Sequence, residues 1–481
     1  MRKLVFVLAL ALALMPATAQ AAPAKIDGSS VGVQLFMWNW NSVAKECTTH
    51  LGPAGYDWVL VMPPQEHING AQWWVHYQPV SYKIESRLGS RTEFEAMVKA
   101  CQDAGVKVIA DAVINHMMGS ATAQGWTGAE YTKYTHPGLY APEDFHSSKQ
   151  GISDWHDLGQ VQNNELSGLS DLATEKPNVR QAIAGYLNDL LSLGVYGFRI
   201  DAARHIPAAD LQAIEALLPA NTYFLQEVAS KLSPDIAEYY PTGDVWEFDW
   251  VSLMKTSFIE TGAAQFLPSQ IKDSSLQPSQ NVVTMVTNHD TERNGSAITT
   301  DDAAKQQLAF IYTLASNYGK PMVYSGYSFS DYDSAPNLLS SGKVANASCP
   351  SGTATPKTSY KNSQFTCQHR WKGVEAMIAW RDTVGDATET GVKGSMGILS
   401  FGRGEAGHVV MNSNTKTTRV KIKTQMAAGK YCDLITGGRN ANIFPKKCLG
   451  VTIVVDRYGY ISASVTKQTA IVISKDSRRR F

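Results

Sequence analysis

The stretch GFRIDAARH (197–205) places four reactive polar side chains at the tip of an otherwise apolar run. They are Arg199, Asp201, Arg204 and His205. A charged cluster in such a position is exposed to solvent, paired within itself or used in catalysis. Two later apolar runs also lead to carboxylates, because FLQEV (224–228) contains Glu227 and VTNHD (286–290) ends in His289 and Asp290. Three carboxylates at the ends of apolar runs favour a role in catalysis.

Two carboxylates in different environments are what glycoside hydrolysis requires, because one attacks the anomeric carbon and the other protonates the leaving oxygen. Arg199 precedes Asp201 by two residues, so both side chains lie on one face of a strand, and the positive charge favours an ionised nucleophile. Glu227 follows the apolar run YFLQ, where burial would raise the carboxyl pKa and suit a proton donor. Asp290 is then expected to hydrogen-bond sugar hydroxyls and to help distort the ring.

A parallel barrel is the framework that would bring these strand ends together. Eight apolar runs without polar alternation predict parallel strands buried on both faces, at 31–38, 58–64, 106–116, 195–202, 222–228, 245–250, 281–290 and 320–326. Amphipathic helices are predicted between them, for example over 91–105 and 177–194. The expected fold class is α/β, a closed (β/α)8 TIM barrel with functional residues at the strands' C-terminal ends.

Two regions interrupt the βα pattern. Residues 117–172, rich in Gly, Thr, His, Tyr and Asp, are far longer than an ordinary βα loop and predict an inserted domain after the third strand. Residues 388–481 change to short alternating strands with turn signals, which predicts a C-terminal antiparallel β-domain. The barrel then consists of 22–116 and 173–387, and 330–365 is expected to form a long surface loop.

The composition restricts the class of partner. The formal net charge is +0, so a nucleic-acid partner is not expected. Arg2 and Lys3, an apolar run to Leu14 and the small residues 19–21 predict a secretory signal over 1–21. No later segment reads as membrane-spanning. We therefore expect a secreted monomer, released to the medium or retained in the periplasm.

The chain has six cysteines, which allow fifteen pairings, so connectivity does not follow from the count. An even number in an exported chain favours disulfides over free buried thiols, which remain the alternative. The close spacing of the last four cysteines favours two of the pairs and leaves the third: Cys349–Cys367, Cys432–Cys448 and Cys47–Cys101.

The joint pattern resembles family 13 of the glycoside hydrolases, the α-amylases. DAVINH (111–116), GFRIDAARH, FLQEV and VTNHD are similar to its four sequence regions, in order and spacing. WWVHYQPVSYKI (73–84) and GLSDLAT (168–174) resemble the animal-type branch in particular, although TERNGSAITTDD after the last region is shorter and has one glycine. The resemblance runs from about residue 31 to the C-terminus and implies a Greek-key C-terminal domain. The three cysteine pairs match family disulfides.

The resemblance implies endo-hydrolysis of α-1,4-glucosidic bonds in starch, glycogen and malto-oligosaccharides, with retained anomeric configuration. Asp201 would be the nucleophile, Glu227 the acid/base and Asp290 the transition-state stabiliser. Substrate would be bound on the glycone side and at the cleavage point by Trp73, Trp74, Tyr77, Gln78, His116, Arg199 and His289. Arg204 and His205 would lie on the leaving-group side, and the family usually has Lys where Arg204 stands.

The resemblance also implies one calcium ion between the barrel and the inserted domain. Asn115 and Asp171 would bind it through side chains, and Gln162 and His205 through backbone carbonyls; oxygen donors of this kind suit calcium. Chloride is not expected. Arg199 and Asn288 match two chloride-binding positions of animal-type relatives, but the third falls at Ser328, and Lys320 is the one basic residue in that segment.

Two alternative functions remain open at this stage. A maltogenic or transglycosylating sibling of the same fold would keep every motif, because the choice between water and a sugar acceptor depends on subsite detail. A non-catalytic binding subunit of the family is disfavoured, since such proteins have usually lost a carboxylate and this chain keeps all three.

Overall fold

A computed structural model describes residues 26–229, 233–443 and 447–479. The predicted signal segment 1–21 lies outside the described residues. Eight parallel strands close into a barrel in the order β1-β10-β9-β8-β7-β6-β3-β2, which confirms the predicted fold class. The strands are β1 Gly32–Leu35, β2 Trp58–Val61, β3 Lys107–Ala112, β6 Gly197–Ile200, β7 Tyr223–Gln226, β8 Asp244–Trp246, β9 Val282–Met285 and β10 Lys320–Ser325.

Seven of the eight predicted strand segments contain a barrel strand and the segment 245–250 overlaps β8, but the strands are shorter than the apolar runs. β9 ends at Met285, and the following residues lead into the short helix α10 (His289–Arg293). Likewise, β8 ends at Trp246 and α8 begins at Phe248, where the run 245–250 predicted a strand. Apolar character continues past the strand ends because the next residues, such as Val286 after β9 and Trp250 in α8, are also buried.

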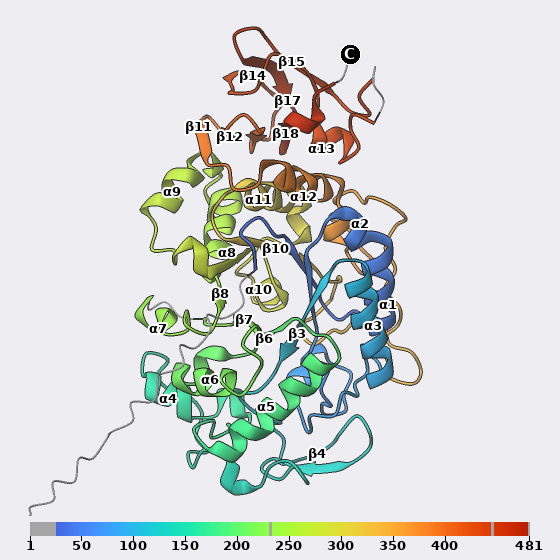
Figure 1. Cartoon of the computed structure of the whole chain (residues 1–481), viewed down its shortest axis with the longest axis vertical. Helices are drawn as coiled ribbons and strands as arrows, with labels where there is room; N and C mark the ends of the chain where they lie inside the picture. Colours follow the sequence, from blue (N-terminus) through green and yellow to red (C-terminus); the bar gives the residue numbers. More distant parts are fainter. Residues whose placement is uncertain (1–25, 230–232, 444–446, 480–481) are drawn as a thin grey trace, which may run out of the picture.

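Helices surround the barrel, as Figure 1 shows. They are α1 Trp40–Glu46, α2 Gly52–Ala54, α3 Arg91–Asp103, α5 Pro177–Ser192, α6 Ala208–Glu215, α7 Ser233–Ala237, α8 Phe248–Lys255, α9 Leu267–Asp273, α11 Ala303–Ala315 and α12 Lys372–Val384. α3 shows how the sequence sets the start and the buried face of such a helix. Ser90 and Glu93 form a capping box at its start, and Phe94, Met97 and Cys101 are buried on one face.

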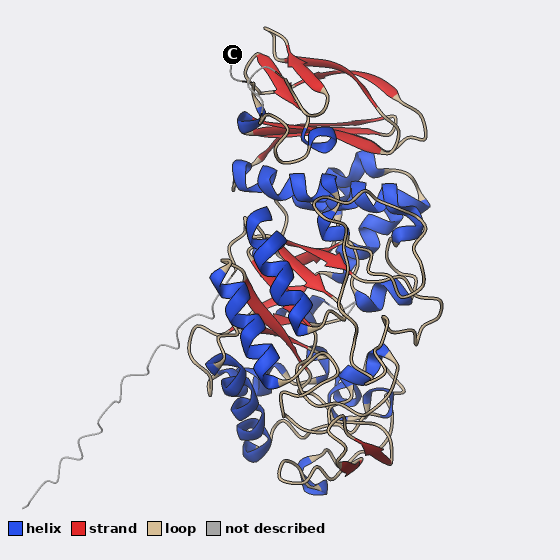
Figure 2. Cartoon of the chain, turned by 90° about the vertical axis from the view of Figure 1, so that its right-hand side faces the viewer, coloured by secondary structure: helices blue, strands red, loops and turns tan. Residues whose placement is uncertain are grey.

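The long segment between β3 and α5 holds a small inserted region with a two-stranded sheet, β4 (Thr122–Gln124) and β5 (Glu130–Thr132), and the helix α4 (Leu158–Asn163). At the opposite end of the molecule, two antiparallel sheets stack face to face (Figure 2). The sheet nearer the barrel contains β11 Glu389–Ser395, β12 Ile398–Arg403, β13 Gly407–Asn412 and β18 Thr469–Ser474.

The outer sheet has the order β14-β17-β16-β15, so three consecutive antiparallel strands, β15 to β17, are joined by β14 beside the last of them, which is a Greek-key strand order. Its strands are β14 Thr418–Lys423, β15 Gly429–Cys432, β16 Thr452–Val455 and β17 Tyr460–Val465, and α13 (Leu434–Gly437) lies between β15 and β16. The inner faces of the two sheets enclose a separate apolar core that includes Val410, Ile453, Ile461 and Ile473.

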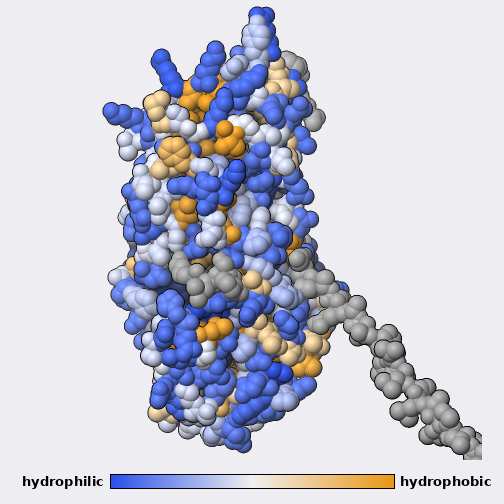
Figure 3. Space-filling model, turned by 90° about the vertical axis from the view of Figure 1, so that its left-hand side faces the viewer, coloured by the Kyte–Doolittle hydropathy of each residue, from blue (hydrophilic) through white to orange (hydrophobic). Residues whose placement is uncertain are grey.

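Three disulfides join Cys47 to Cys101, Cys349 to Cys367 and Cys432 to Cys448, and these are the three pairs inferred from the sequence. Among the described residues, no helix is both long and apolar enough to cross a membrane. The face in Figure 3 is largely hydrophilic, with small separate apolar patches.

Candidate active site

The three predicted carboxylates lie at the C-terminal ends of three barrel strands. Asp201 follows β6 directly and Glu227 follows β7 directly. The chain turns sharply after Asp201, because Ala202 adopts a left-handed conformation (φ 49°), and the Ala202 N–H donates to Glu227 Oε2 at 2.9 Å. Asp290 occupies the first turn of α10, whose N-terminus is capped by the Asn288 side chain. Turn geometry thus points all three carboxylates into the barrel mouth.

Arg199 is the charge that holds this cluster together. Its side chain is 0% exposed, and Nη1 lies 2.6 Å from Asp201 Oδ1 and 2.8 Å from Asp111 Oδ1. Nη2 lies 2.6 Å from Glu227 Oε2. One buried guanidinium therefore faces three carboxylates, which leaves an excess of negative charge and makes their protonation states interdependent.

Burial raises the pKa values of Asp201, Glu227 and Asp290, and the positive charge of Arg199 opposes that rise at all three. Glu227 is raised further by the neighbouring Asp201 and Asp290 carboxylates. Asp201 accepts a hydrogen bond from Arg199, whereas Glu227 accepts one from the Ala202 amide. This arrangement favours a protonated Glu227 and an ionised Asp201.

The predicted glycone-side residues converge on one wall of the mouth. The Tyr77 and His289 rings stack with centroids 5.2 Å apart, and Tyr77 OH donates to Asp111 Oδ2 at 2.9 Å. His116 Nε2 lies 3.0 Å from the Tyr77 carbonyl. Trp73 and Trp74 stand beside Tyr77 on the short helix Trp73–Tyr77. Gln78 differs from the others, because its Oε1 accepts from the Gly119 amide and ties the wall to the inserted region.

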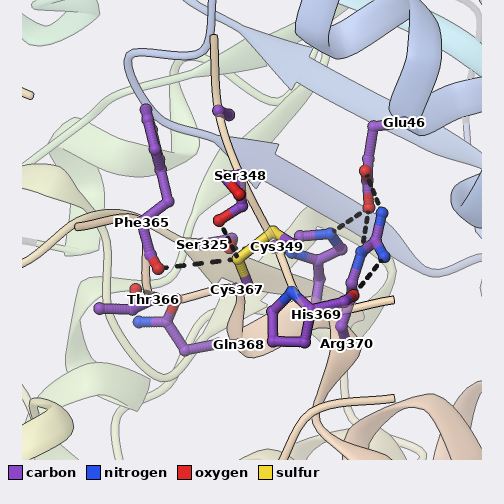
Figure 4. The surroundings of a disulfide bond; sticks show 12 residues. Glu46, Ser325, Ser348, Cys349, Phe365, Thr366, Cys367, Gln368, His369 and Arg370 are labelled. Carbon is purple, nitrogen blue, oxygen red and sulfur yellow. Dashed lines mark hydrogen bonds and ion pairs between the residues drawn. A yellow bond between two sulfur atoms is a disulfide. The ribbon is translucent and has the colours of Figure 1, made fainter. Parts of the chain in front are cut away.

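The loop between β10 and α12 anchors the two tryptophans. Trp73 Nε1 donates to the Tyr332 carbonyl at 2.6 Å, and Trp74 Nε1 donates to Asp333 Oδ1 at 2.8 Å. The base of this loop is fixed by Cys349–Cys367 and, next to it, by a buried network in which His369 bridges Ser325 and Glu46 (Figure 4). Contacts with residues 259 positions away in the sequence thus set the position of Trp73 and Trp74.

Two adjoining cavities meet at the carboxylates. The first, about 290 Å³, is lined by all three carboxylates and by Trp73, Trp74, Tyr77, His116, Arg204, His205 and His289. The second, about 530 Å³, shares Arg204, Glu227 and Asp290 with the first and adds Trp155 and Phe248. The carboxylates therefore lie inside a cleft that continues to both sides of them.

Several residues of this cleft were not predicted from the sequence. Asp111 is the first residue of the motif DAVINH but was given no role, and it pairs with Arg199. Trp155 belongs to the inserted region, where its ring contacts His205 edge-on, and Phe248 follows β8. No motif marked Trp155 or Phe248; the one available signal was the presence of aromatic residues in segments already expected near the mouth.

The residues expected to bind calcium form two contacts between the barrel and the inserted region. Asn115 Nδ2 lies 3.3 Å from Asp171 Oδ1, and His205 Nδ1 lies 2.9 Å from the Val161 carbonyl, which brings α4 and Gln162 beside His205. Asp171 also contacts His146 at 2.6 Å, and burial raises its pKa to about 6. The described residues contain no group of three or more His, Cys, Asp and Glu suited to a metal. The expected set does not require one, because two of its donors are backbone carbonyls and one is an amide.

The residues relevant to chloride are separated in space. Lys320 Nζ lies 2.8 Å from Asp244 Oδ1, and both residues begin their strands, at the end of the barrel away from the carboxylates. The Ser328 hydroxyl donates to the Lys361 carbonyl within the β10–α12 loop. Asn288 Nδ2 and Arg199 Nε have no partner within the described part of the chain. Arg199 is thus the one cation among the three predicted chloride positions.

Comparison with known proteins agrees with this geometry. The α-amylase catalytic-domain model matches residues 73–249, and the C-terminal all-β domain model of α-amylases matches residues 393–476. An α-amylase of Streptomyces violaceus is 40% identical over 464 residues, covering 95% of this chain and 75% of that protein. The chain belongs to the α-amylase family. A second α-amylase, from Thermomonospora curvata, is 40% identical over 89% of this chain and 71% of its own length.

A solved structure resembles this chain over almost its whole length. α-Amylase I of Eisenia fetida, in a mutant form complexed with maltohexaose, superposes with a TM-score of 0.81 at 27% identity and covers 95% of this chain and 99% of its own. As a member of the α-amylase family with these relatives, the chain is a glycoside hydrolase. The non-catalytic alternative finds no support in these relatives.

Proposed function

We propose that this α-amylase family member is a secreted enzyme that hydrolyses internal α-1,4-glucosidic bonds of starch, glycogen and malto-oligosaccharides with retention of anomeric configuration. The observation that carries the proposal is the continuation of the cleft on both sides of Asp201, Glu227 and Asp290. A polysaccharide can then lie across the carboxylates with sugars on both sides, which internal cleavage requires.

The chemistry follows from the two environments. Glu227 donates its proton to the glycosidic oxygen while Asp201 attacks the anomeric carbon, so the leaving chain departs and a covalent glycosyl–Asp201 ester forms. Water then attacks the same carbon, gives its proton to Glu227 and releases Asp201. Two inversions give net retention. Asp290, beside His289 Nε2 at 3.3 Å, is placed to bind hydroxyls of the sugar that distorts.

The substrate contacts are assigned by position in the cleft. Tyr77 provides the face on which the reacting sugar stacks, with Trp73 and Trp74 beyond it and His116, His289 and Gln78 at the wall. Arg204 and His205 lie towards the leaving group. A calcium ion held by Asn115, Gln162, Asp171 and His205 would fix the inserted region against the mouth. The three disulfides support export, and we propose a monomer.

The deciding experiment compares Glu227→Gln and Asp201→Asn with the exposed control Glu130→Gln. Each cleft variant should lose several orders of magnitude in kcat on amylose and keep the wild-type melting temperature within a few degrees, because the reaction path itself is removed. Fresh product from the wild-type enzyme should be the α-anomer by NMR. Activity above about a tenth of wild type in either variant would refute the assignment.

A transglycosylating or maltogenic activity is the second candidate. It is favoured by one observation, the aromatic rings of Trp155 and Phe248 on the leaving-group side, where a sugar acceptor could stack in place of water. Sizing the early products from a long amylose separates the two. Mixed short oligosaccharides mean endo-hydrolysis, lengthened or cyclic products mean transfer, and maltose alone means a maltogenic enzyme.

A further inference from the structure

Two buried arginines meet where the barrel joins the C-terminal domain, at the end of the barrel opposite the active site. Arg381 lies on α12 and Arg403 at the end of β12, and their exposed fractions are 2% and 1%. Both arginines contact the last residues of α11. In Figure 1, α11 and α12 lie between the barrel and the C-terminal sheets. Arg381 Nη1 donates to the carbonyls of Leu314 and Ser316, and Arg403 Nη1 to that of Ala315 between them.

The positive charge at this junction is not balanced by close carboxylates. No Asp or Glu oxygen of the described residues lies within 4.0 Å of either guanidinium. The C-terminus of α11 supplies only about half a negative elementary charge against two full positive ones. Burial and, after it, the Arg403 charge lower the pKa of Arg381 to about 9. Asp386, Asp27 and Asp57 act on Arg381, and Glu389 and Asp386 act on Arg403, but none of these carboxylates forms a direct ion pair with either guanidinium, as buried charges normally do.

A carbonyl cage alone does not account for the arrangement. Arg87 shows what such a cage looks like: one buried guanidinium donates to the carbonyls of Gly70, Ala71 and Gln72 and to His76. Arg381 is held similarly, with all five N–H groups directed at carbonyls. Arg403 is different, because only three of its five N–H groups have acceptors within the described residues.

A cavity of about 440 Å³ adjoins these groups. Arg381, Arg403 and Lys320 contribute its cationic wall, and Ser279, Gln280 and Asn317 contribute polar groups. Lys320 is already paired with Asp244. Asp386 is the one carboxylate among the described residues that line the cavity, and it is exposed. Glu389 also acts on Arg403, and its Oε1 accepts from the Ser316 hydroxyl and the Asn317 amide, so its charge reaches Arg403 without a direct ion pair.

We propose that this cavity binds a small oxyanion of the sulfate or phosphate class, which accepts hydrogen bonds from the two remaining N–H groups of Arg403 and adds a counter-charge in direct contact with that guanidinium. A tetrahedral oxyanion matches the two free N–H groups of a guanidinium fork. The ligand would link α12, β12 and the end of α11, and so would strengthen the junction between the barrel and the C-terminal domain. The site is separate from the active site and independent of the proposed activity.

The test is a thermal-shift titration of the purified, calcium-loaded enzyme with sodium sulfate. Sulfate stays below about 10 mM, where its general exclusion from the protein surface is negligible, and sodium chloride keeps the ionic strength constant. The wild-type melting temperature should rise saturably by about 2 °C or more, because the ligand binds the folded state. Isothermal titration calorimetry at the same sulfate concentrations gives the stoichiometry, expected to be one.

Two variants decide whether the anion occupies this cavity. Asp386→Asn removes a lining carboxylate and should lower the half-saturating sulfate concentration about threefold or more, since a nearby like charge no longer opposes the anion. Arg403→Gln should abolish the saturable shift. The matched control Asp273→Asn, also exposed, should leave the titration unchanged.

The outcomes are distinguishable even if Arg403→Gln does not fold. A wild-type enzyme with no saturable sulfate response overturns the proposal. So does an Asp386→Asn variant that is destabilised while its sulfate response stays as in the wild type, because Asp386 itself would then be the counter-charge. Tighter sulfate binding by Asp386→Asn supports the site without reference to the Arg403 variant.

Discussion

Replacing Arg199 by glutamine should move the whole pH profile of kcat/KM to higher pH. Arg199 lowers the pKa of both Asp201 and Glu227, so its loss raises both. Asp201 must be ionised to attack, and a higher pKa shifts the acid limb upward. Glu227 must be protonated to donate, and a higher pKa shifts the alkaline limb upward as well.

The size of the shift follows from the contacts. Arg199 Nη1 lies 2.6 Å from Asp201 Oδ1, and Nη2 lies 2.6 Å from Glu227 Oε2. A charge-assisted hydrogen bond contributes about 1.5–3 kcal/mol, and one pKa unit corresponds to about 1.4 kcal/mol. Each limb is therefore expected to move by about 1 to 2 units.

The assay measures kcat/KM on a chromogenic maltooligosaccharide from about pH 4 to 10, the range that spans the pKa values of free carboxylic acids and amines. Arg199→Lys keeps the positive charge and should shift the limbs by less than Arg199→Gln does. Arg180→Gln breaks a comparable Arg–Asp pair, with Asp210, and should leave the profile unchanged. A folded Arg199→Gln enzyme with an unshifted profile would refute the electrostatic role of Arg199.

Three further predictions concern the surroundings of the site. Chelation should lower the melting temperature and added calcium should restore it, whereas indifference to chelator together with no calcium by elemental analysis would contradict the calcium site. Activity should not require chloride, because the other two predicted positions supply no cation beside Arg199; saturable, chloride-specific activation against a chloride-free salt of equal ionic strength would show otherwise. Asp333→Ala should raise KM for maltoheptaose about three- to tenfold with kcat little changed, because Trp74 loses one hydrogen bond. A fall in kcat at unchanged KM would place Asp333 in the chemistry instead.

The barrel was predictable because its strands are buried on both faces, which produces continuous apolar runs that stand out against amphipathic helices. The strand ends were less predictable. The apolar runs of β8 and β9 continue past the strands, since the residues that follow, such as Trp250 and Val286, are buried as well. β11 gives little strand signal for the opposite reason, because most of its residues are exposed and its sequence, ETGVKGS, is poor in apolar residues.

Some residues of the candidate site could likewise be predicted from the sequence, and others could not. Asp201, Glu227 and Asp290 were found because they directly follow or lie close after strands, where sequence position almost fixes spatial position. The pairing of Arg199 with Asp111 depends on the register of the neighbouring strands β3 and β6, which the predicted strand order does not fix. The contacts of Trp73 and Trp74 with Tyr332 and Asp333 depend on the path of a loop without helix or strand, and such a path follows from tertiary packing alone.

Different structural elements position the catalytic residues of the cleft and its substrate-contacting residues. Asp201 and Glu227 extend from adjacent barrel strands whose register is set by hydrogen bonds along β6 and β7, and Arg199 couples them through a buried guanidinium. Trp74 and Trp155, by contrast, depend on a disulfide-braced loop and on the inserted region. Substitutions in those peripheral segments can change chain-length preference or acceptor choice while the spacing of the carboxylates stays fixed. Variation among family members with this barrel is therefore expected first in KM and product distribution, and last in the pH profile set by Arg199.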